Sequence, residues 1–570
     1  MRRNSGKSAI VFSAVIVLAA VVTLVPGGAV VKQEPPPAGD AATIPVQVDK
    51  GPPKLDHALY MFQKIHETQG PDKAREYAER RRLDVEGDAV RVIVESSGTM
   101  IASERINGRA AVLENHVRSL GGRVEDSYQE LFQCRIPAAG LWELAGNPAV
   151  RFVRPPLRPH TQAVTSEGVA LTGANLWHDL DPYRASSAGV KVCVLDLGFK
   201  NHNLLLGTEL PATVRTRSFR ADGDIAAGEV HGTACAELVH DMMPDAQMYL
   251  VNFNTELEHR QAVEWLISEK VDVISYSIAW FNAGDGKGTG PICQTVKRAA
   301  DNGILWVGAA GNYAEDHWEG TFGDSDADGW HNFSGSDEII NFYVPAGTPV
   351  GGFLNWDDWG VWNGIFYSGS SQDYDLYLYW WVGGNWVFVD KSENWQDGDQ
   401  WPVEFIGYWY HPTVSTYWGF AVKKYSATRN CKLELFVTGN YDAVEYNVPE
   451  GSLAIPADSE HCIAVGATDT VTYPDTYHPY SSRGPTHDGR VKPDFTAPSG
   501  VSVSNLTYGY RGFYGTSASA PHMAGGLALM KGKTPYGWDE VRAILESRAV
   551  DLGPSGKDNQ FGFGRLNVKK

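Results

Sequence analysis

The chain has 570 residues and a mass of 62.4 kDa, more than one ordinary domain holds. Hydrophobic residues make up 43% and charged residues 21%, so the chain can bury large cores, and global disorder is excluded. The net charge of −19 argues against a nucleic-acid partner held by phosphate contacts. Six cysteines without a CxxC pair exclude a disulfide framework and a cysteine-rich zinc site, so we expect most of them to be buried thiols.

Residues 1–30 have the composition of an export signal. The basic residues Arg2, Arg3 and Lys7 precede an uncharged apolar run over 9–25, which is the pattern of a Sec-type signal peptide. The same run is at the lower limit for a membrane span, so an uncleaved anchor stays open as the alternative. Both interpretations place the bulk of the protein outside the cytoplasm, secreted or in the cell envelope. A membrane partner is expected only if this segment is retained.

Two segments follow before the main domain. Residues 31–86 begin as a tether rich in Pro, Ala and Gly and continue with two stretches of helical spacing, to which we assign no function. Residues 87–158 follow the order strand, helix, two strands, helix, strand. This is the split βαβ order of small ferredoxin-like α+β domains, which have no fixed function by themselves.

The rest of the chain predicts an α/β domain with an insertion. Over 164–318 short apolar runs alternate with amphipathic helices, and this pattern resumes over 448–570. Such runs suit strands buried on both faces, which predicts a mostly parallel sheet covered by helices. Residues 319–447 instead contain alternating aromatic runs between Gly, Asp and Asn turns, typical of an antiparallel β-sandwich.

Four polar residues stand at predicted strand ends or strand-to-helix turns: Asp196 in VCVLDLG, His231 in HGTACAE, Asn312 in GAAGN and Ser517 in GTSASAPHMAG. Taken singly, each suits a structural role as a cap, a core histidine or a turn. Ligands bind at the carboxyl ends of strands in open α/β sheets, so the four together point to one site. His231 and Ser517 are 286 residues apart, and 157 of these remain when the 129 residues of the predicted insertion are removed. The strands and helices that must bring Ser517 back to His231 occupy these 157 residues, so no long structureless loop is needed.

These segments, together with PYSSRGPTHDGRVKPDFTAP over 479–498, resemble the subtilisin-like serine proteases. The resemblance implies that Asp196 orients His231 and that His231 takes the proton of Ser517, which attacks a peptide carbonyl. It implies that Asn312 donates to the oxyanion, and, because residue 312 is not acidic, activity at neutral to alkaline pH. It further implies an endopeptidase acting on protein or peptide substrates, with no cofactor required for the chemistry.

The same resemblance assigns substrate binding to two segments, which comprise Ser277, Ile278, Ala279 and Gly308, Ala309, Ala310, Gly311. The family usually has Ser-x-Gly in the first segment, whereas this chain has Ala279 followed by Trp280. This departure predicts a bulkier pocket wall, and it leaves the primary specificity open.

The α+β domain over 87–158 resembles the propeptides of this family. This likeness implies a precursor that the domain inhibits in cis and that is cut near residues 155–165. A plain accessory domain is the alternative.

The predicted sandwich contains one candidate metal site. Asp324, Asp326 and Asp328, followed by Gly329, form the start of a calcium loop. Position twelve of that loop is Gly335 where a bidentate Glu is expected, so a structural calcium ion and an acidic surface turn both stay open. Twelve of the 18 Trp lie over 318–418, and we expect the aromatic residues in the sandwich core first and stacked on a sugar or substrate second.

Taken together, the sequence predicts a secreted, monomeric serine endopeptidase made as an inactive precursor. The rival hypothesis is a non-catalytic binding protein that keeps this fold and holds a partner on the aromatic sandwich. The intact set of Asp196, His231, Asn312 and Ser517 favours the enzyme, because a binding module has no need of all four.

Overall fold

The computed structural model describes residues 52–80, 83–97, 112–128, 131–156, 164–178, 189–364, 367–398, 400–440, 442–470 and 475–569. The chain divides into two compact units with a boundary after residue 161. The apolar run over 9–25 and most of the predicted cleavage region lie outside the described residues. Within the described ranges, no helix has the length and apolar character needed to cross a membrane.

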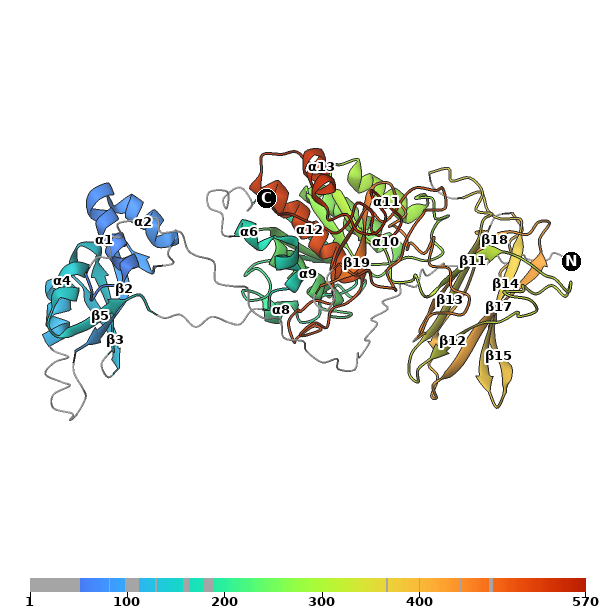
Figure 1. The fold of residues 1–570 in the computed structure, drawn as a ribbon, viewed down its shortest axis with the longest axis horizontal. Helices are drawn as coiled ribbons and strands as arrows, with labels where there is room; N and C mark the ends of the chain where they lie inside the picture. Colours follow the sequence, from blue (N-terminus) through green and yellow to red (C-terminus); the bar gives the residue numbers. More distant parts are fainter. Residues whose placement is uncertain are drawn as a thin grey trace, which may run out of the picture. The chain divides into compact units, whose positions relative to one another are not determined.

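The N-terminal unit is an α+β domain (Figure 1). Its elements are α1 (His57–Gln69), α2 (Pro71–Arg80), β1 (Val85–Glu86), β2 (Ala89–Ser96), β3 (Arg123–Tyr128), β4 (Leu131–Pro137), η1 (Ala138–Gly140), α4 (Leu141–Gly146) and β5 (Val150–Arg154). All strand pairs are antiparallel, and β2 lies between β4 and β5. Part of the helix expected between β2 and β3 is described, over residues 112–119. The split βαβ order is therefore confirmed.

Helices α1 and α2 belong to this same unit. Leu59 and Phe62 of α1 and Ala74 of α2 are buried in one cluster with Val92 and Val94 of β2. The boundary predicted at residue 87 therefore lies inside the domain. The sequence did not reveal this because the helices reach the sheet only through contacts between distant segments.

The second unit contains a seven-stranded parallel sheet in the order β20-β19-β10-β9-β6-β8-β7. The elements of this domain are α5 (Glu167–Thr172), α6 (Asn175–His178), β6 (Lys191–Asp196), α8 (His202–Leu205), β7 (Arg215–Ser218), α9 (His231–Met242), β8 (Gln247–Asn252), α10 (Glu256–Glu269), β9 (Val273–Tyr276), α11 (Pro291–Ala300), β10 (Leu305–Ala309), β19 (Cys462–Asp469), β20 (Phe495–Ser499), α12 (Thr516–Lys533) and α13 (Trp538–Arg548).

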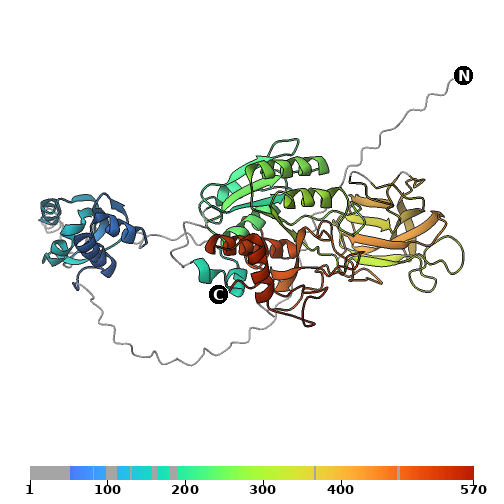
Figure 2. The ribbon, with the colours of Figure 1, turned by 90° about the horizontal axis from the view of Figure 1, so that it is seen from above.

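Both faces of this sheet are covered by helices, as predicted. Val192 and Val194 of β6 belong to one core cluster with α9 and α12, whereas Cys193 and Leu195 belong to a second cluster with α10 and α11. Successive residues of a strand point to opposite faces, which explains the unbroken apolar run. Figure 2 shows the light-green helices on one side of this domain and the red helices on the other.

The chain between β10 and β19 forms a β-sandwich (Figure 1). Its strands are β11 (His317–Thr321), β12 (Ile340–Val344), β13 (Val350–Trp356), β14 (Asp373–Val382), β15 (Asn385–Ser392), β16 (Val403–Tyr410), β17 (Thr416–Ser426) and β18 (Lys432–Thr438). They form two antiparallel sheets, ordered β11-β18-β13-β16 and β12-β17-β14-β15. The Val448 amide donates to the His317 carbonyl at 2.8 Å, which closes the insertion at its base.

The aromatic residues of the sandwich occupy two environments. Trp356 and Phe420 lie in the core between the two sheets, as expected. Trp395 is 64% exposed and Trp381 39% exposed. The sequence alternation therefore identifies the strands but does not separate core tryptophans from surface ones.

Candidate active site

Asp196 and His231 form a buried pair at the carboxyl end of the parallel sheet. Asp196 is the last residue of β6 and is 1% exposed. Its Oδ2 lies 2.9 Å from His231 Nδ1, and its Oδ1 accepts the Leu197 amide at 2.8 Å. Since a carboxylate accepts, His231 Nδ1 carries the proton, and Nε2 of the neutral ring is left with a lone pair.

The first turn of α9 brings His231 close to β6 because residue 232 has no side chain. A Cβ on Gly232 would come 2.6 Å from the Gly198 carbonyl oxygen and 2.8 Å from Asp196 Cβ. The Phe513 ring contacts the imidazole edge-on, with ring centroids 5.8 Å apart. The histidine therefore has a fixed position and orientation.

Ser517 stands in the first turn of α12, where backbone N–H groups have no partner within the helix. Gly515 precedes the helix with φ of 99°, a conformation that favours glycine. A Cβ there would come 3.0 Å from Asn312 Nδ2, so glycine also allows the close approach of Asn312. Ser277 Oγ donates to the Ser517 carbonyl at 3.1 Å, which ties this turn to the segment after β9.

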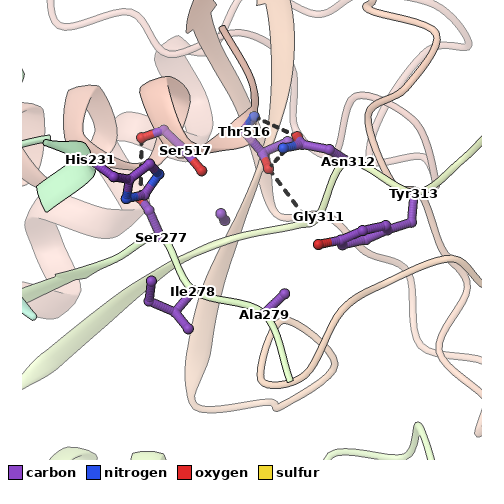
Figure 3. Close-up of a pocket in the computed structure, with 10 residues that line it drawn as sticks. His231, Ser277, Ile278, Ala279, Gly311, Asn312, Tyr313, Thr516 and Ser517 are labelled. Carbon is purple, nitrogen blue, oxygen red and sulfur yellow. Dashed lines mark hydrogen bonds between the residues drawn. The ribbon is translucent and has the colours of Figure 1, made fainter. Parts of the chain in front are cut away.

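Asn312 follows β10 and faces the same cleft as His231 and Ser517 (Figure 3). Its Oδ1 accepts the Thr516 backbone amide at 2.8 Å and the Thr516 hydroxyl at 2.9 Å. A backbone N–H can only donate, so the atom that meets it must be the oxygen of the Asn312 amide. The Nδ2 donor is thereby left for a group bound in the cleft. Thr516 is a positioning residue that the sequence contained within GTSASAP but that our sequence analysis missed.

The predicted substrate-binding residues are only partly brought together. Ser277, Ile278, Ala279, Ala309 and Gly311 line the cleft, and Tyr313 and Thr516 join them. The structure does not place the other two there. Gly308 lies within β10, where a Cβ would come 2.6 Å from Cys462 Sγ of β19, and Ala310 is fully buried beside Leu453 and Ala464. Successive residues of β10 face opposite sides of the sheet, so Ala309 at its end reaches the cleft and Gly308 does not.

Trp280 does not form the bulky pocket wall that the sequence suggested. It is 3% exposed and lies in the core cluster under α10 and α11. Its indole stacks on Phe253 with centroids 6.2 Å apart, and its Nε1 donates to the Tyr276 hydroxyl at 2.6 Å. Only Ile278 and Ala279 of this segment present apolar side chains to the cleft.

All six cysteines are buried free thiols, as predicted. Cys235 lies nearest to the site, in α9, and its Sγ donates to the Ser517 carbonyl at 3.5 Å. Burial raises the pKa of the Cys235 thiol well above its usual value. A thiol held protonated is a poor nucleophile, so the hydroxyl of Ser517 is the nucleophile that the cleft offers.

The three aspartates of the calcium hypothesis lie in the segment between β11 and β12. Their carboxylate oxygens come within 4.8 Å of one another. Asp324 accepts backbone amides from Ala327 at 2.7 Å and Gly329 at 2.9 Å, and Asp328 accepts the Trp330 amide at 3.0 Å. These contacts suit an acidic turn, and calcium binding by Asp324, Asp326 and Asp328 stays a prediction.

Known relatives match a limited part of this chain. The extracellular serine protease of Serratia marcescens is 30% identical over 168 residues, 25% of this chain and 16% of that protein. Subtilisin Savinase of Lederbergia lenta is 32% identical over 148 residues, 25% of this chain and 47% of that protein. The chain thus spans less than half the length of these relatives. The solved structure of the CspB protease of Clostridium perfringens aligns with 70% of this chain and 97% of its own, at 14% identity and a TM-score of 0.46.

The family comparison covers more of the chain. Residues 187–336 and 409–564 match the family described as Peptidase_S8, the Subtilase family. The two segments make up more than half of the 570 residues and include Asp196, His231, Asn312 and Ser517. On this match, the chain belongs to the subtilase family.

Proposed function

We propose that this protein is a serine endopeptidase, which hydrolyses peptide bonds of protein or peptide substrates through an acyl-enzyme on Ser517. One observation carries the proposal: His231, Asn312 and Ser517 line a single cleft, and Asp196 is bonded to His231 at its edge. These residues come from four segments spread over more than 300 positions, and each has the role that acyl transfer requires.

In the first step, Nε2 of His231 takes the proton of Ser517 Oγ while this oxygen attacks the scissile carbonyl carbon. Asp196 holds the ring in the required tautomer and stabilises the imidazolium that forms. The negative oxygen of the tetrahedral intermediate accepts hydrogen bonds from the Asn312 side-chain amide and the Ser517 backbone N–H.

In the second step, the imidazolium gives its proton to the leaving amine nitrogen as the C–N bond breaks. Water then attacks the ester carbonyl and loses a proton to His231. When the ester C–O bond breaks, His231 returns this proton to Ser517 Oγ, which restores the enzyme and releases the acid product.

A fluorophosphonate probe tests this proposal directly, because it reacts with activated serine hydroxyls. We expect a single adduct at Ser517 of the mature protein and none in Ser517→Ala. Ser268→Ala, at an exposed serine of α10, is the matched control and should label like the wild type. Mature protein that folds but takes up no probe would favour the rival hypothesis of a non-catalytic binding protein.

We further propose that the protein is exported and that its N-terminal α+β domain inhibits it until cleavage near residues 155–165. The basic and apolar start of the chain supports export. The compact fold of the α+β domain and its likeness to family propeptides support the inhibitory role. Two further expectations stay predictions: the monomeric state, and a structural calcium ion bound by Asp324, Asp326 and Asp328.

Intact mass and probe labelling on the same sample test the precursor proposal. Secreted protein should begin after residue 154 and label rapidly, whereas chains that retain the α+β domain should label slowly. Rapid labelling of the uncut chain would contradict inhibition. A secreted form that keeps residues 52–156 indefinitely would favour the accessory-domain alternative.

A further inference from the structure

Three side chains with metal-binding atoms converge where the sandwich meets the parallel-sheet domain. Glu319 lies on β11, Glu434 on β18, and His487 in the segment between β19 and β20. His487 Nε2 is 3.2 Å from Glu319 Oε2 and 3.2 Å from Glu434 Oε1. The ligand atoms all lie within 4.8 Å of one another, and the side chains are 11% to 20% exposed. We call this group the junction cluster.

The register of the sandwich strands places the two carboxylates side by side. Glu319 is directly opposite Glu434, and Glu434 is directly opposite Asn355 of β13. Leu433 and Leu435, the neighbours of Glu434, point into the sandwich core. Glu434 therefore points out of the other face, where Phe436 packs against Phe281 and Tyr313 of the parallel-sheet domain.

The two ring nitrogens of His487 have different surroundings: Nδ1 has a hydrogen-bond partner, and Nε2 faces the two carboxylates. Nδ1 is 2.9 Å from the Asp285 carbonyl, which only accepts, so Nδ1 carries a proton. Nε2 is buried and makes no well-formed hydrogen bond, although two carboxylate oxygens are close. The cluster thus needs positive charge at Nε2, either a second proton or a metal ion.

The spacing agrees with that of two ligand atoms on one metal ion. A hydrogen bond between imidazolium and carboxylate is about 2.7–2.9 Å long. Two donor atoms bound at about 2.0 Å to one tetrahedral zinc ion lie about 3.3 Å apart. Both distances from His487 Nε2 are 3.2 Å, close to the tetrahedral spacing.

Each group is also oriented by a further partner, which is typical of metal ligands. Glu434 Oε2 accepts from Asn355 Nδ2 at 2.6 Å, and Glu319 Oε1 pairs with Lys432 Nζ at 2.5 Å. His317 Nε2 also lies 3.3 Å from Glu434 Oε1, the oxygen that His487 Nε2 approaches. A cavity of about 260 Å³, lined in part by Glu319, Glu434 and His487, offers room for water beside them.

We propose that Glu319, Glu434 and His487 bind one divalent transition-metal ion, with zinc as the species to test and water as a further ligand. An imidazole with two carboxylates suits zinc, whereas calcium takes oxygen ligands only. The ion would join β11 and β18 of the sandwich to the segment that carries His487. The ion would also stabilise this side of the cleft. The reason is that the Asp285 carbonyl accepts a hydrogen bond from His487, and Asp285 follows the cleft-lining residues 277–279 in the chain.

The alternative occupant is a proton. Without a metal ion, Glu434 and Glu319 raise the pKa of His487 to about 11, and an imidazolium would fill the same position. Zinc retention distinguishes the two, because an imidazolium leaves no lone pair for a metal.

The test uses the full chain with Ser517→Ala, so that its outcome does not depend on proteolysis. After incubation with zinc and dialysis, elemental analysis should find about one zinc per chain. His487→Gln and Glu434→Gln should each weaken zinc binding by about 100-fold or more in a competition titration. His411→Gln, at an exposed sandwich histidine, and Asp326→Asn, in the acidic turn, should bind zinc like the parent.

A parent protein that retains no zinc, or equal binding in the parent and the junction variants, would overturn the proposal. If the variants fail to fold, X-ray absorption on the zinc-loaded parent replaces them. A first shell of one imidazole and oxygen atoms supports the site, and a shell with sulfur or without imidazole overturns it. Neither result bears on the peptidase proposal.

Discussion

The parallel sheet and the inserted sandwich bury polar side chains in different places. In the parallel sheet, Asp196 ends β6, while Ser277 and Asn312 come just after β9 and β10. In the sandwich, the buried carboxylate of Glu434 lies within β18, directly opposite Glu319 of β11 and Asn355 of β13. Parallel strands all end at one edge, so their polar ends meet in one cleft. Antiparallel strands run both ways, so polar residues gather in cross-strand rows on one face.

This difference separates two kinds of function. The strand ends of the parallel sheet are joined to glycine-containing turns and helix starts, which aim side chains at a substrate. The cross-strand row of the sandwich faces the neighbouring domain, which suits attachment. Each of the following variants changes one of these two domains and leaves the other intact.

The largest effect is expected at the catalytic edge of the parallel sheet. Ser517→Ala removes the nucleophile and should lower kcat by on the order of 10⁶. Asp196→Asn leaves His231 without its carboxylate partner and should lower kcat by about 10⁴. Steady-state hydrolysis of a peptide substrate measures both. Thermal unfolding should be nearly unchanged in Ser517→Ala, and a kcat within tenfold of wild type would contradict the assignment.

The next effect concerns the stability of the sandwich core. Trp356→Ala removes a side chain that is 1% exposed, and large aromatic truncations of this kind cost about 3–5 kcal/mol. Trp395→Ala is the matched control at 64% exposure, for which we expect a change within about 0.5 kcal/mol. Denaturant unfolding in the Ser517→Ala background measures the free energy of unfolding. If both variants lose the same free energy of unfolding, the burial of a tryptophan does not determine its contribution to stability here.

A smaller effect is expected at the oxyanion donor. Asn312→Leu removes the amide that Thr516 orients and should lower kcat by about 10²–10³, with little change in KM. The reason is that the donor binds the negative oxygen, which exists only after attack. A large rise in KM at constant kcat would show instead that Asn312 binds the substrate in its ground state. Asn302→Leu, at an exposed position after α11, serves as control.

The smallest effect concerns pH and Glu237 of α9. Its carboxylate is buried, accepts the Ser504 amide at 2.6 Å and the Thr507 hydroxyl at 2.8 Å, and has its pKa raised by burial from 4.5 to about 7. The folded state therefore holds this proton more tightly than the unfolded state. The contribution of this proton to the free energy of unfolding is complete below about pH 4.5. It decreases by on the order of 2–3 kcal/mol as the pH rises to about 7.

Glu237→Gln should flatten this part of the pH profile, since an amide does not titrate and can still bond to both partners. Unfolding free energies of the Ser517→Ala parent and its Glu237→Gln variant, measured at several values between pH 4.5 and 8, give the comparison. Parallel profiles would show that Glu237 does not titrate in this range.

Local patterns predicted much of this molecule. The parallel sheet was predictable because strands buried on both faces appear as unbroken apolar runs, as in Val190–Leu195 of the sequence. The sandwich was predictable from alternating aromatic runs such as those of β14 and β17. The motifs around Asp196, His231 and Ser517 identified candidate residues because glycines shape each turn locally.

Other features escaped the sequence analysis for a common reason. Trp280 looked like a pocket wall, but its place in the core under α10 and α11 depends on how Phe253 and Tyr276 pack there. Gly308 and Ala310 belong to a continuous segment of which only alternate residues reach the cleft. In each case, the side of the segment that faces the cleft is decided by packing against segments far away in the chain.

By itself, therefore, the sequence determined the order of the domains and the class of each sheet, since these depend on local burial patterns. Its short motifs resemble those of the subtilisin-like serine proteases, and this resemblance implies the four residues expected to carry catalysis. Only the tertiary structure decided that α1 and α2 join the α+β domain and that Thr516 orients Asn312. It alone brought Glu319, Glu434 and His487 together. The physical reason is that such groupings depend on strand register and on packing between distant segments, which no local pattern encodes.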